Sequence, residues 1–211
     1  MTSGIAPEEL DYNFFIEMSK IVIIEYGAGN LFSVRVAIER LGYEVVCSAD
    51  PRVVREADKV IFPGVGQAAA AMRQLKESGM DRVIPELKVP VLGICLGMQL
   101  MCAYSEEGET EGLGIFPMRV EEFGRCGKVP HMGWNEIRGL KSGLFDGVVE
   151  GEMVYFVHSY CVPVGEYSIA TCDYQIAFSA AIRKGNFWGC QFHPEKSAGV
   201  GEKIIENFLK M

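Results

Sequence analysis

The sequence predicts an α/β protein with a central, mostly parallel sheet flanked by helices and an antiparallel extension in its second half. Two patterns indicate this fold. Between residues 20 and 102, short apolar runs rich in branched side chains alternate with amphipathic segments, as in a parallel sheet covered on both faces. After residue 102, short strand-like segments follow one another with turn residues between them, which favours antiparallel pairing.

The first half supplies the alternating elements. Its predicted strands are apolar runs at Lys20–Ile24, Tyr43–Cys47, Lys59–Phe62 and Val89–Ile94. Its predicted helices cover Leu31–Leu41, Gln67–Lys76, Met80–Leu87 and Met98–Cys102. The first of these helices repeats apolar residues at helical spacing and stops at Gly42, a residue typical of helix C-termini.

The second half is richer in strands. The acidic, glycine-rich segment Ser105–Gly114 is expected to be a loop, and Val200–Leu209 a closing amphipathic helix. Strands are predicted at Pro117–Phe123, Trp134–Ile137, Met153–Val157, Ser168–Asp173, Ala180–Lys184 and Phe187–Phe192. No internal repeat or low-complexity linker interrupts the chain, so we expect a single domain over residues 18–211, preceded by an N-terminal extension, residues 1–17, of unknown role.

Composition excludes several classes of protein. The formal charge of −8, from 20 basic and 28 acidic residues, argues against a general nucleic-acid binder. No apolar run approaches the roughly 20 residues of a membrane span, and residues 1–17 lack the basic start of a signal peptide. The 7 cysteines are scattered without a Cys-x-x-Cys pair, which predicts no zinc site, no disulfide framework and reduced thiols in the cytoplasm.

Cys95 is the first candidate functional residue, because it lies between two glycines in Gly93-Ile94-Cys95-Leu96-Gly97. This pattern, at the junction of a buried strand and a helix, is the cysteine version of a nucleophile elbow. The turn places Cys95 at a helix N-terminus, where the dipole favours a thiolate and free N–H groups can stabilise an oxyanion. A buried structural cysteine beside two packing glycines is the competing interpretation, and this stretch alone does not separate the two.

Of the 3 histidines, His193 is the one placed for catalysis. It follows the strand Phe187–Phe192, at the end of the sheet where open α/β folds carry their sites. Glu195 stands two residues on and can hydrogen-bond the far ring nitrogen. Cys95, His193 and Glu195 then supply a nucleophile, a proton carrier and an orienting acid, which favours a thiol hydrolase or acyl transferase.

A second glycine-rich strand end, Pro63-Gly64-Val65-Gly66, is either an ordinary β-to-α turn or part of the same site. In the second interpretation, a backbone N–H of Gly64 or Val65 joins the N–H of Leu96 to form an oxyanion hole. Because neighbouring strand ends share one crevice in open α/β folds, the second interpretation is reasonable.

Two motifs together resemble the class I (triad) glutamine amidotransferases: Gly93-Ile94-Cys95-Leu96-Gly97-Met98-Gln99 and Gln191-Phe192-His193-Pro194-Glu195. The resemblance runs from about Lys20 to the C-terminus and implies that family's fold for the domain at 18–211. Three further segments, 25–31, 129–135 and 193–197, are similar to the glutaminase subunits of imidazole glycerol phosphate synthases, a branch of this family in histidine biosynthesis.

The resemblance implies a role for each matching position. Cys95 would attack the side-chain amide of L-glutamine, forming a glutamyl thioester and expelling ammonia. His193 would protonate that leaving group and later activate the hydrolytic water, with Glu195 behind it. The implied glutamine contacts are Gly66, Gln99, Glu107, Ser159 and Tyr160. Without the resemblance, Glu107 reads as a solvated residue of an acidic loop, and His158 is expected to be structural because the triad is already filled.

The resemblance also implies a partner. In the resembled enzymes this subunit forms a heterodimer with a (β/α)₈-barrel cyclase, which uses the ammonia to make imidazole glycerol phosphate and an aminoimidazole carboxamide ribotide. Segments implied to face the partner contain Asn30, Trp134, Tyr155 and Lys196. No cofactor, metal, nucleic acid or membrane is implied. The chain has neither a Gly-x-Gly-x-x-Gly fingerprint nor a Gly-Lys-Ser/Thr loop, so the acceptor substrate is expected on the partner.

Three alternatives remain at this point. The first is a glutaminase serving another synthase, such as pyridoxal phosphate or anthranilate synthesis, against which the segment 130–135 speaks. The second is a stand-alone cysteine peptidase or deglycase, which fits Gln99 and the His-Pro-Glu segment poorly. The third is a non-enzymatic scaffold in which Cys95 is inert.

Overall fold

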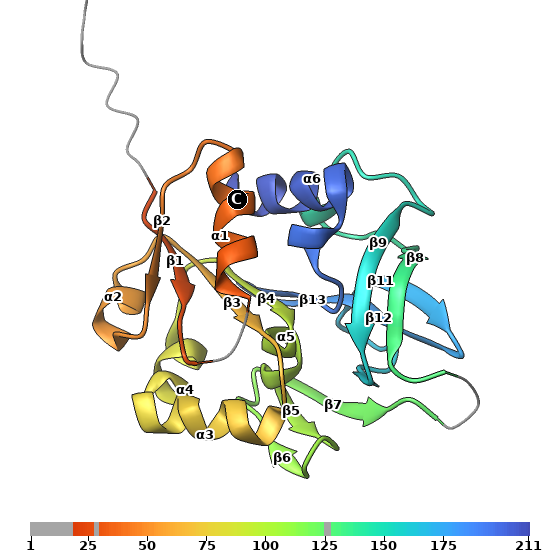
Figure 1. The fold of residues 1–211 in the computed structure, drawn as a ribbon, viewed down its shortest axis with the longest axis horizontal. Helices are drawn as coiled ribbons and strands as arrows, with labels where there is room; N and C mark the ends of the chain where they lie inside the picture. Colours follow the sequence, from red (N-terminus) through yellow and green to blue (C-terminus); the bar gives the residue numbers. More distant parts are fainter. Residues whose placement is uncertain (1–18, 28–29, 125–127) are drawn as a thin grey trace, which may run out of the picture.

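A seven-stranded sheet forms the centre of the molecule, in the order β11-β12-β13-β4-β3-β1-β2 (Figure 1). The computed structural model describes residues 19–27, 30–124 and 128–211, so the predicted extension at 1–17 lies outside the described residues. The parallel strands are β1 (Ile21–Ile24), β2 (Val45–Ser48), β3 (Lys59–Gly64), β4 (Val91–Cys95) and β13 (Phe187–Cys190). β12 (Ile176–Lys184) and β11 (Ser168–Tyr174) add antiparallel pairs beyond β13, which confirms the predicted fold class.

Helices cover both faces of this sheet (Figure 1). α1 (Leu31–Arg40) and α6 (Ala198–Leu209) lie on one face; α3 (Ala68–Ser78), α4 (Met80–Val83) and α5 (Leu96–Leu100) lie on the other. Successive strand residues alternate between the two cores, since Ile21 and Ile23 pack under α1 while Val22 and Ile24 face the opposite side. Among the described residues, no helix is both long enough and apolar enough to cross a membrane.

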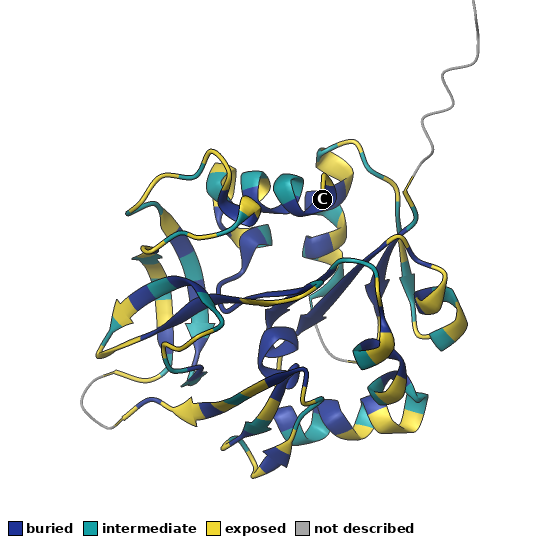
Figure 2. Ribbon diagram, turned by 180° about the vertical axis from the view of Figure 1, so that it is seen from behind, coloured by how far each residue is buried: buried dark blue, intermediate teal, exposed yellow. Residues whose placement is uncertain are grey.

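Burial explains why the parallel strands read as continuous apolar runs. All four residues of β1 and all five of β4 are buried, and Figure 2 shows the central strands dark blue beneath helices that are exposed on their outer sides. A parallel sheet covered on both faces has no solvent-facing side, so its strands need no polar alternation.

Two smaller sheets stand beside the main one. β5 (Cys102–Ser105), β6 (Thr110–Glu111), β7 (Phe116–Glu122) and β10 (Tyr160–Cys161) form a four-stranded sheet. β8 (His131–Glu136) and β9 (Met153–His158) form an antiparallel pair. Of the strands that follow residue 102, β11, β12 and β13 join the main sheet, and the others form these two smaller sheets.

Several boundaries differ from the sequence-based expectation for local reasons. The acidic segment at 105–114 contains β6, which pairs with β5 through Tyr104 and Ser105, so it is a hairpin rather than a plain loop. The helix after Cys95 begins at Leu96 and ends at Leu100, because residues 102–105 enter β5. A one-turn helix, α2 (Pro51–Arg55), was not predicted, although Asp50 caps it and Pro51 opens it, both typical helix-start signals.

Candidate active site

β4 ends in a strained turn at Cys95. Its backbone has φ 51° and ψ −109°, outside the regions that non-glycine residues prefer. The next residue, Leu96, begins α5, so the cysteine caps a short helix at the carboxyl edge of the sheet. This is the geometry of a nucleophile elbow, in which strain is kept at a site where the side chain must project from a sharp turn.

The glycines around Cys95 are required by close backbone approach. A Cβ on Gly97 would lie 1.8 Å from the carbonyl oxygen of Phe62 on β3. A Cβ on Gly93 would lie 2.8 Å from the backbone nitrogen of Met98 on α5. Contacts this short exclude any side chain, so both glycines allow α5 to pack directly against the sheet.

His193 and Glu195 follow the neighbouring strand, β13. This strand pairs in parallel with β4, Cys190 opposite Ile94, which brings the two strand ends to one edge of the sheet. His193 Nδ1 donates a hydrogen bond to Glu195 Oε1 at 2.8 Å, and the two side chains are only 2% and 1% exposed. His193 Nε2 has no hydrogen-bond partner among the described residues, so this nitrogen is available to a bound molecule.

The surroundings of His193 favour its charged form. Burial, the largest single influence, lowers the pKa of this imidazole, but the adjacent Cys95 and Glu195 together outweigh it and raise the pKa to about 9. His193 therefore holds a proton at neutral pH beside a cysteine sulfur. This is the arrangement that a thiol nucleophile and a proton donor require.

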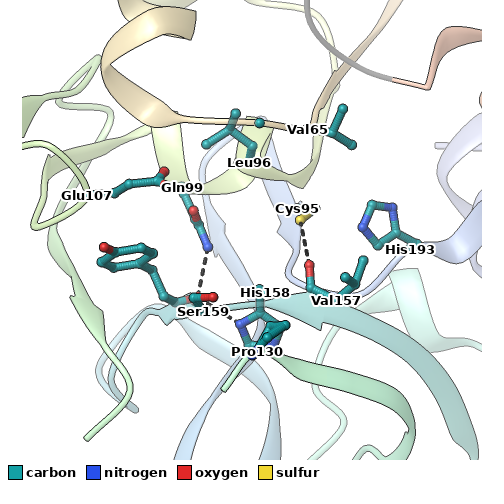
Figure 3. Close-up of a pocket in the computed structure, with 12 residues that line it drawn as sticks. Val65, Cys95, Leu96, Gln99, Glu107, Pro130, Val157, His158, Ser159 and His193 are labelled. Atoms are coloured by element: carbon teal, nitrogen blue, oxygen red, sulfur yellow. Dashed lines mark hydrogen bonds between the residues drawn. The ribbon is translucent and has the colours of Figure 1, made fainter. Parts of the chain in front are cut away.

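A cavity of about 270 Å³ opens in front of Cys95 (Figure 3). Of the residues predicted for the site, it is lined by Val65, Gly66, Cys95, Leu96, Gln99, Glu107, Ser159, Tyr160 and His193. Gly64 and Glu195 do not line it and lie behind this surface. Residues far apart in the sequence thus meet in one place. Among the described residues, no cluster of three or more His, Cys, Asp or Glu side chains is arranged to hold a metal ion.

Glu107 is a structural residue as well as a cavity residue. Its Oε2 accepts a hydrogen bond of 2.8 Å from the backbone nitrogen of Ala68, the first residue of α3. Burial raises the pKa of this carboxyl, against the opposing effect of that hydrogen bond. The carboxylate is half-buried and fixed, so it is not the solvated side chain that an acidic loop would suggest.

The turn after β3 lies alongside the elbow. Gly64 pairs with Cys95 in the parallel register of β3 and β4. The buried Tyr26 hydroxyl donates to the carbonyl of Pro63 at 2.9 Å, and burial raises the pKa of this phenol. Gly66 has φ 100°, a conformation that favours glycine. The first N–H groups of a helix have no intrahelical acceptor, so the N–H of Leu96 is available as well.

Sequence reasoning missed that His158 also lines the cavity. Its Nδ1 donates to the carbonyl of Tyr160 at 2.7 Å, and its Nε2 lies 3.1 Å from Nδ1 of His131. Burial is the main cause that lowers the pKa of His158 to about 3 and of His131 to about 4. The position of His158 in the sequence could have indicated this, because it ends β9 and directly precedes the predicted glutamine contacts Ser159 and Tyr160.

The residues predicted to face a partner are exposed or partly exposed, and none of them lines the cavity. Trp134 and Tyr155 are opposite one another on β8 and β9, with ring centroids 6.0 Å apart in an edge-to-face arrangement. Lys196 is exposed on the 3₁₀ turn Pro194–Lys196 beside His193. Asn30 caps α1, because its side chain accepts from the backbone nitrogen of Ser33 at 3.3 Å.

The sequence of this chain matches a known protein family over most of its length. The family description "Glutamine amidotransferase class-I" matches residues 22–211 of the chain. The chain belongs to the class-I glutamine amidotransferase family. The matched range includes Cys95 and every other residue that lines the cavity.

Curated relatives of this class-I amidotransferase are similar over nearly their full lengths. "Imidazole glycerol phosphate synthase subunit HisH" of Bacteroides fragilis (strain YCH46) is 58% identical over 195 residues, covering 91% of this chain and 100% of that protein. The protein of the same name from Colwellia psychrerythraea (strain 34H) is 46% identical, covering 92% and 93%. A solved structure described as a glutamine amidotransferase aligns with TM-score 0.70 and 17% identity, covering 90% and 97%, and supports the fold alone.

Proposed function

We propose that this chain is the glutamine amidotransferase subunit of an imidazole glycerol phosphate synthase in histidine biosynthesis, and that Cys95, His193 and Glu195 hydrolyse L-glutamine. The observation that carries the proposal is the elbow cysteine beside a buried His–Glu pair whose free Nε2 faces the same cavity. The 58% identity to a synthase subunit over that protein's whole length supports the choice of synthase.

The geometry supports a two-step reaction. Cys95 attacks the side-chain carbonyl of glutamine as a thiolate, and the C–N bond breaks as the protonated His193 gives the proton on Nε2 to the departing ammonia. The neutral His193 then takes a proton from water, the resulting hydroxide attacks the thioester, and glutamate leaves with the Cys95 thiolate and the protonated His193 restored. Glu195 accepts the Nδ1–H throughout, so Nε2 is always the nitrogen that exchanges protons.

The cavity offers groups for each end of the substrate. The N–H groups of Leu96 and of Gly64 or Val65 are proposed to hold the tetrahedral oxyanion, because they belong to the two turns that meet at Cys95. Glu107 and Gln99 are proposed to receive the glutamine ammonium. Gly66, Ser159 and Tyr160 would supply backbone contacts around the carboxylate end.

The outer face of the β8–β9 hairpin is proposed to dock a (β/α)₈-barrel cyclase in a heterodimer. Met132 and Trp134 on this face are 61% and 49% exposed, and Val157, opposite Met132, lines the cavity itself. An exposed apolar face that leads directly into an active site is the arrangement expected where a product passes to a second protein. Asn30, Tyr155 and Lys196 would border this surface.

The hairpin is bonded directly to the histidine strand end. The backbone nitrogen of His193 donates to the carbonyl of Tyr155 at 2.9 Å. The Ser197 hydroxyl donates to the carbonyl of His193 at 2.6 Å and accepts from the nitrogen of Tyr155 at 3.0 Å. A cyclase docked on the β8–β9 hairpin would therefore contact backbone that also positions His193. Ammonia is proposed to pass from the cavity to the cyclase without release into solvent.

Two further parts of the proposal concern the whole chain. Residues 18–211 are proposed to act as one amidotransferase domain, consistent with the family match at 22–211. A cytoplasmic location is proposed, consistent with free thiols at all six described cysteines.

Covalent labelling tests the catalytic part. A diazo- or chloroketone analogue of glutamine is expected to alkylate Cys95 alone, in a reaction that added glutamine slows. Cys102 is a matched control, because it is buried at the start of β5, just after α5, and burial raises its thiol pKa to about 12. Labelling at Cys102 with Cys95 untouched would contradict the proposal.

Co-purification tests the partner. The chain is expected to form a 1:1 complex with the barrel cyclase, and Trp134→Ala is expected to weaken it by about tenfold or more. Val46→Ala is the control, because Val46 is equally exposed at 49% but lies on β2, at the opposite edge of the sheet. Equal weakening by both variants, or no complex at all, would refute this part.

A further inference from the structure

Gln191 is a buried polar residue that the mechanism does not use. It follows β13 immediately, two residues before His193, and its side chain is fully buried. Its backbone nitrogen donates to the carbonyl of Ala180 at 2.9 Å, which fixes the residue to the neighbouring strand β12. A buried amide must satisfy its donors and acceptors internally, so its partners indicate what it holds in place.

The orientation of these amides follows from one main-chain carbonyl. The carbonyl of Tyr160 can only accept, so the nearest atom of the Gln99 amide, at 2.9 Å, must be the donor Nε2. The same Nε2 donates to Gln191 Oε1 at 2.9 Å. The other end of the Gln191 amide is therefore its Nε2, and this nitrogen lies 3.7 Å from the sulfur of Cys95.

The Tyr160 carbonyl is itself held in position. His158 Nδ1 donates to it at 2.7 Å, and the other ring nitrogen of His158 is occupied by His131. Gln99 Nε2 thus has two fixed acceptors, the Tyr160 carbonyl and Gln191 Oε1. With both N–H groups engaged on one side, the oxygen of Gln99 is left for the cavity that Gln99 lines (Figure 3).

We propose that Gln191 is a positioning residue of the glutaminase site. Its oxygen fixes the Gln99 amide with the Oε1 atom toward the substrate's ammonium, and its N–H group hydrogen-bonds the Cys95 sulfur. The inference rests on the proposed function for the identity of the substrate. One buried side chain then aligns the group that attacks glutamine with a group that receives the far end of the same molecule.

The sulfur contact has a chemical consequence. Cys95 Sγ lies between two polar groups, the Gln191 amide at 3.7 Å and the carbonyl of Val157 at 3.9 Å. A donor stabilises a sulfur that carries negative charge, while a carbonyl oxygen does not. Removing the Gln191 donor should make the thiol react only at higher pH, whatever the electrophile.

A double-mutant cycle on the assembled complex tests the first role. Gln191→Met, similar in length but without hydrogen bonds, is expected to raise the KM for glutamine about tenfold, the effect of one lost hydrogen bond. In a Gln99→Met background the same change should alter KM less than about twofold, because the amide it orients is gone. Equal effects in the two backgrounds, or no effect in the wild type, would overturn this role.

The pH profile of Cys95 alkylation by iodoacetamide tests the second role. Gln191→Met is expected to move this profile upward by roughly one pH unit, with or without Gln99. Ile182→Val, a fully buried change on β12 opposite β13, controls for general loosening and should leave the profile in place. Identical profiles in the wild type and Gln191→Met, or equal shifts in both variants, would overturn the sulfur contact.

The two roles and the proposed function fail in different ways. If the wild-type complex does not hydrolyse glutamine, the proposed function is wrong, yet the iodoacetamide profile still decides whether Gln191 acts on the sulfur. If glutamine is hydrolysed and neither KM nor the profile responds to Gln191→Met, the proposed function stands and Gln191 is a packing residue. Co-purification of each variant with the cyclase confirms that the variants fold and dock.

Discussion

Two buried histidines face the same cavity with opposite charge preferences. His193 Nδ1 donates to the carboxylate of Glu195, and the pKa of His193 is raised to about 9. His158 Nδ1 donates to the neutral carbonyl of Tyr160, and the pKa of His158 is lowered to about 3. Burial lowers both values, so the adjacent Cys95 and Glu195, which together raise the pKa of His193, are what separate the two histidines.

The free ring nitrogen completes the difference. His193 Nε2 has no partner among the described residues, whereas His158 Nε2 is 3.1 Å from His131. A histidine can carry protons to a substrate only if one nitrogen is free and its charged form is accessible near neutral pH. His193 meets both conditions and His158 meets neither, which teaches that a position beside the cavity is not enough for catalysis.

The same substitution at both positions should break this comparison most visibly. His193→Asn is expected to lower glutaminase kcat by about 10⁶-fold, the scale of losing one member of a cooperating triad. His158→Asn should cost less than about tenfold, because an asparagine amide can still donate to the Tyr160 carbonyl. Steady-state glutaminase assays on the complex measure both, and comparable losses would show that His158 takes part in proton transfer.

Removing the carboxylate should make His193 resemble His158. Glu195→Gln keeps a side chain of the same size but removes the charge that raises the pKa of His193, so the activity is expected to fall about 10⁴-fold. The pH profile of the residual activity should also move to lower pH. A variant with near-normal activity would mean that Glu195 does not orient the imidazole.

The elbow that brings Cys95 to the same cavity as the two histidines can be disturbed without changing any of these three residues. Gly97→Ala places a methyl group against the Phe62 carbonyl, 1.8 Å away, so it should destabilise the fold by about 1–3 kcal/mol or more and reduce activity. Gly199→Ala, at an exposed position of α6 where an added Cβ would meet no atom within 4 Å, should be neutral or stabilising by up to about 1 kcal/mol. Urea unfolding of both variants provides the test; a stable, active Gly97→Ala would disprove the close packing.

The smallest expected effect is on acid stability. His131 and His158 are neutral in the fold, with pKa values near 4 and 3, but titrate near 6.5 when unfolded. Their contribution to the free energy of unfolding is complete above about pH 6.5. It is lost as the pH falls toward 4, because the unfolded chain then binds more protons than the folded chain does. His131→Asn should reduce the loss between pH 7 and 5 by on the order of 1 kcal/mol. If the urea midpoint of His131→Asn depends on pH as strongly as that of the wild type, the two histidines are not a neutral buried pair.

Much of this architecture is readable from the sequence. The buried strands of the parallel sheet appear as continuous apolar runs. The pattern Gly-x-Cys-x-Gly at residues 93–97 indicates the elbow, because only glycine fits where α5 and the sheet backbone approach so closely. His193 and Glu195 are separated by one residue, so their contact is local. Features encoded by a few consecutive residues can be predicted without knowledge of the tertiary structure.

Long-range pairings could not be read in this way. The hydrogen bond between Gln99 and Gln191 spans 92 positions, and nothing in either segment specifies it. The pairing of His131 with His158 depends on a β8–β9 register that leaves a 16-residue connection between the strands, so hairpin turn rules do not apply. Glu107 was expected as an implied glutamine contact, but its cap on α3 required knowing that two loops meet.

The glutamine-to-ammonia comparison in the assembled synthase tests the central claim most directly. With Cys95→Ala in complex with the barrel cyclase, we expect glutamine-dependent synthesis of imidazole glycerol phosphate to disappear while synthesis from added ammonium salt continues at the wild-type rate. That result would assign Cys95 to ammonia production alone. Persistence of glutamine-dependent synthesis, or loss of both activities in a complex that still assembles, would contradict the account.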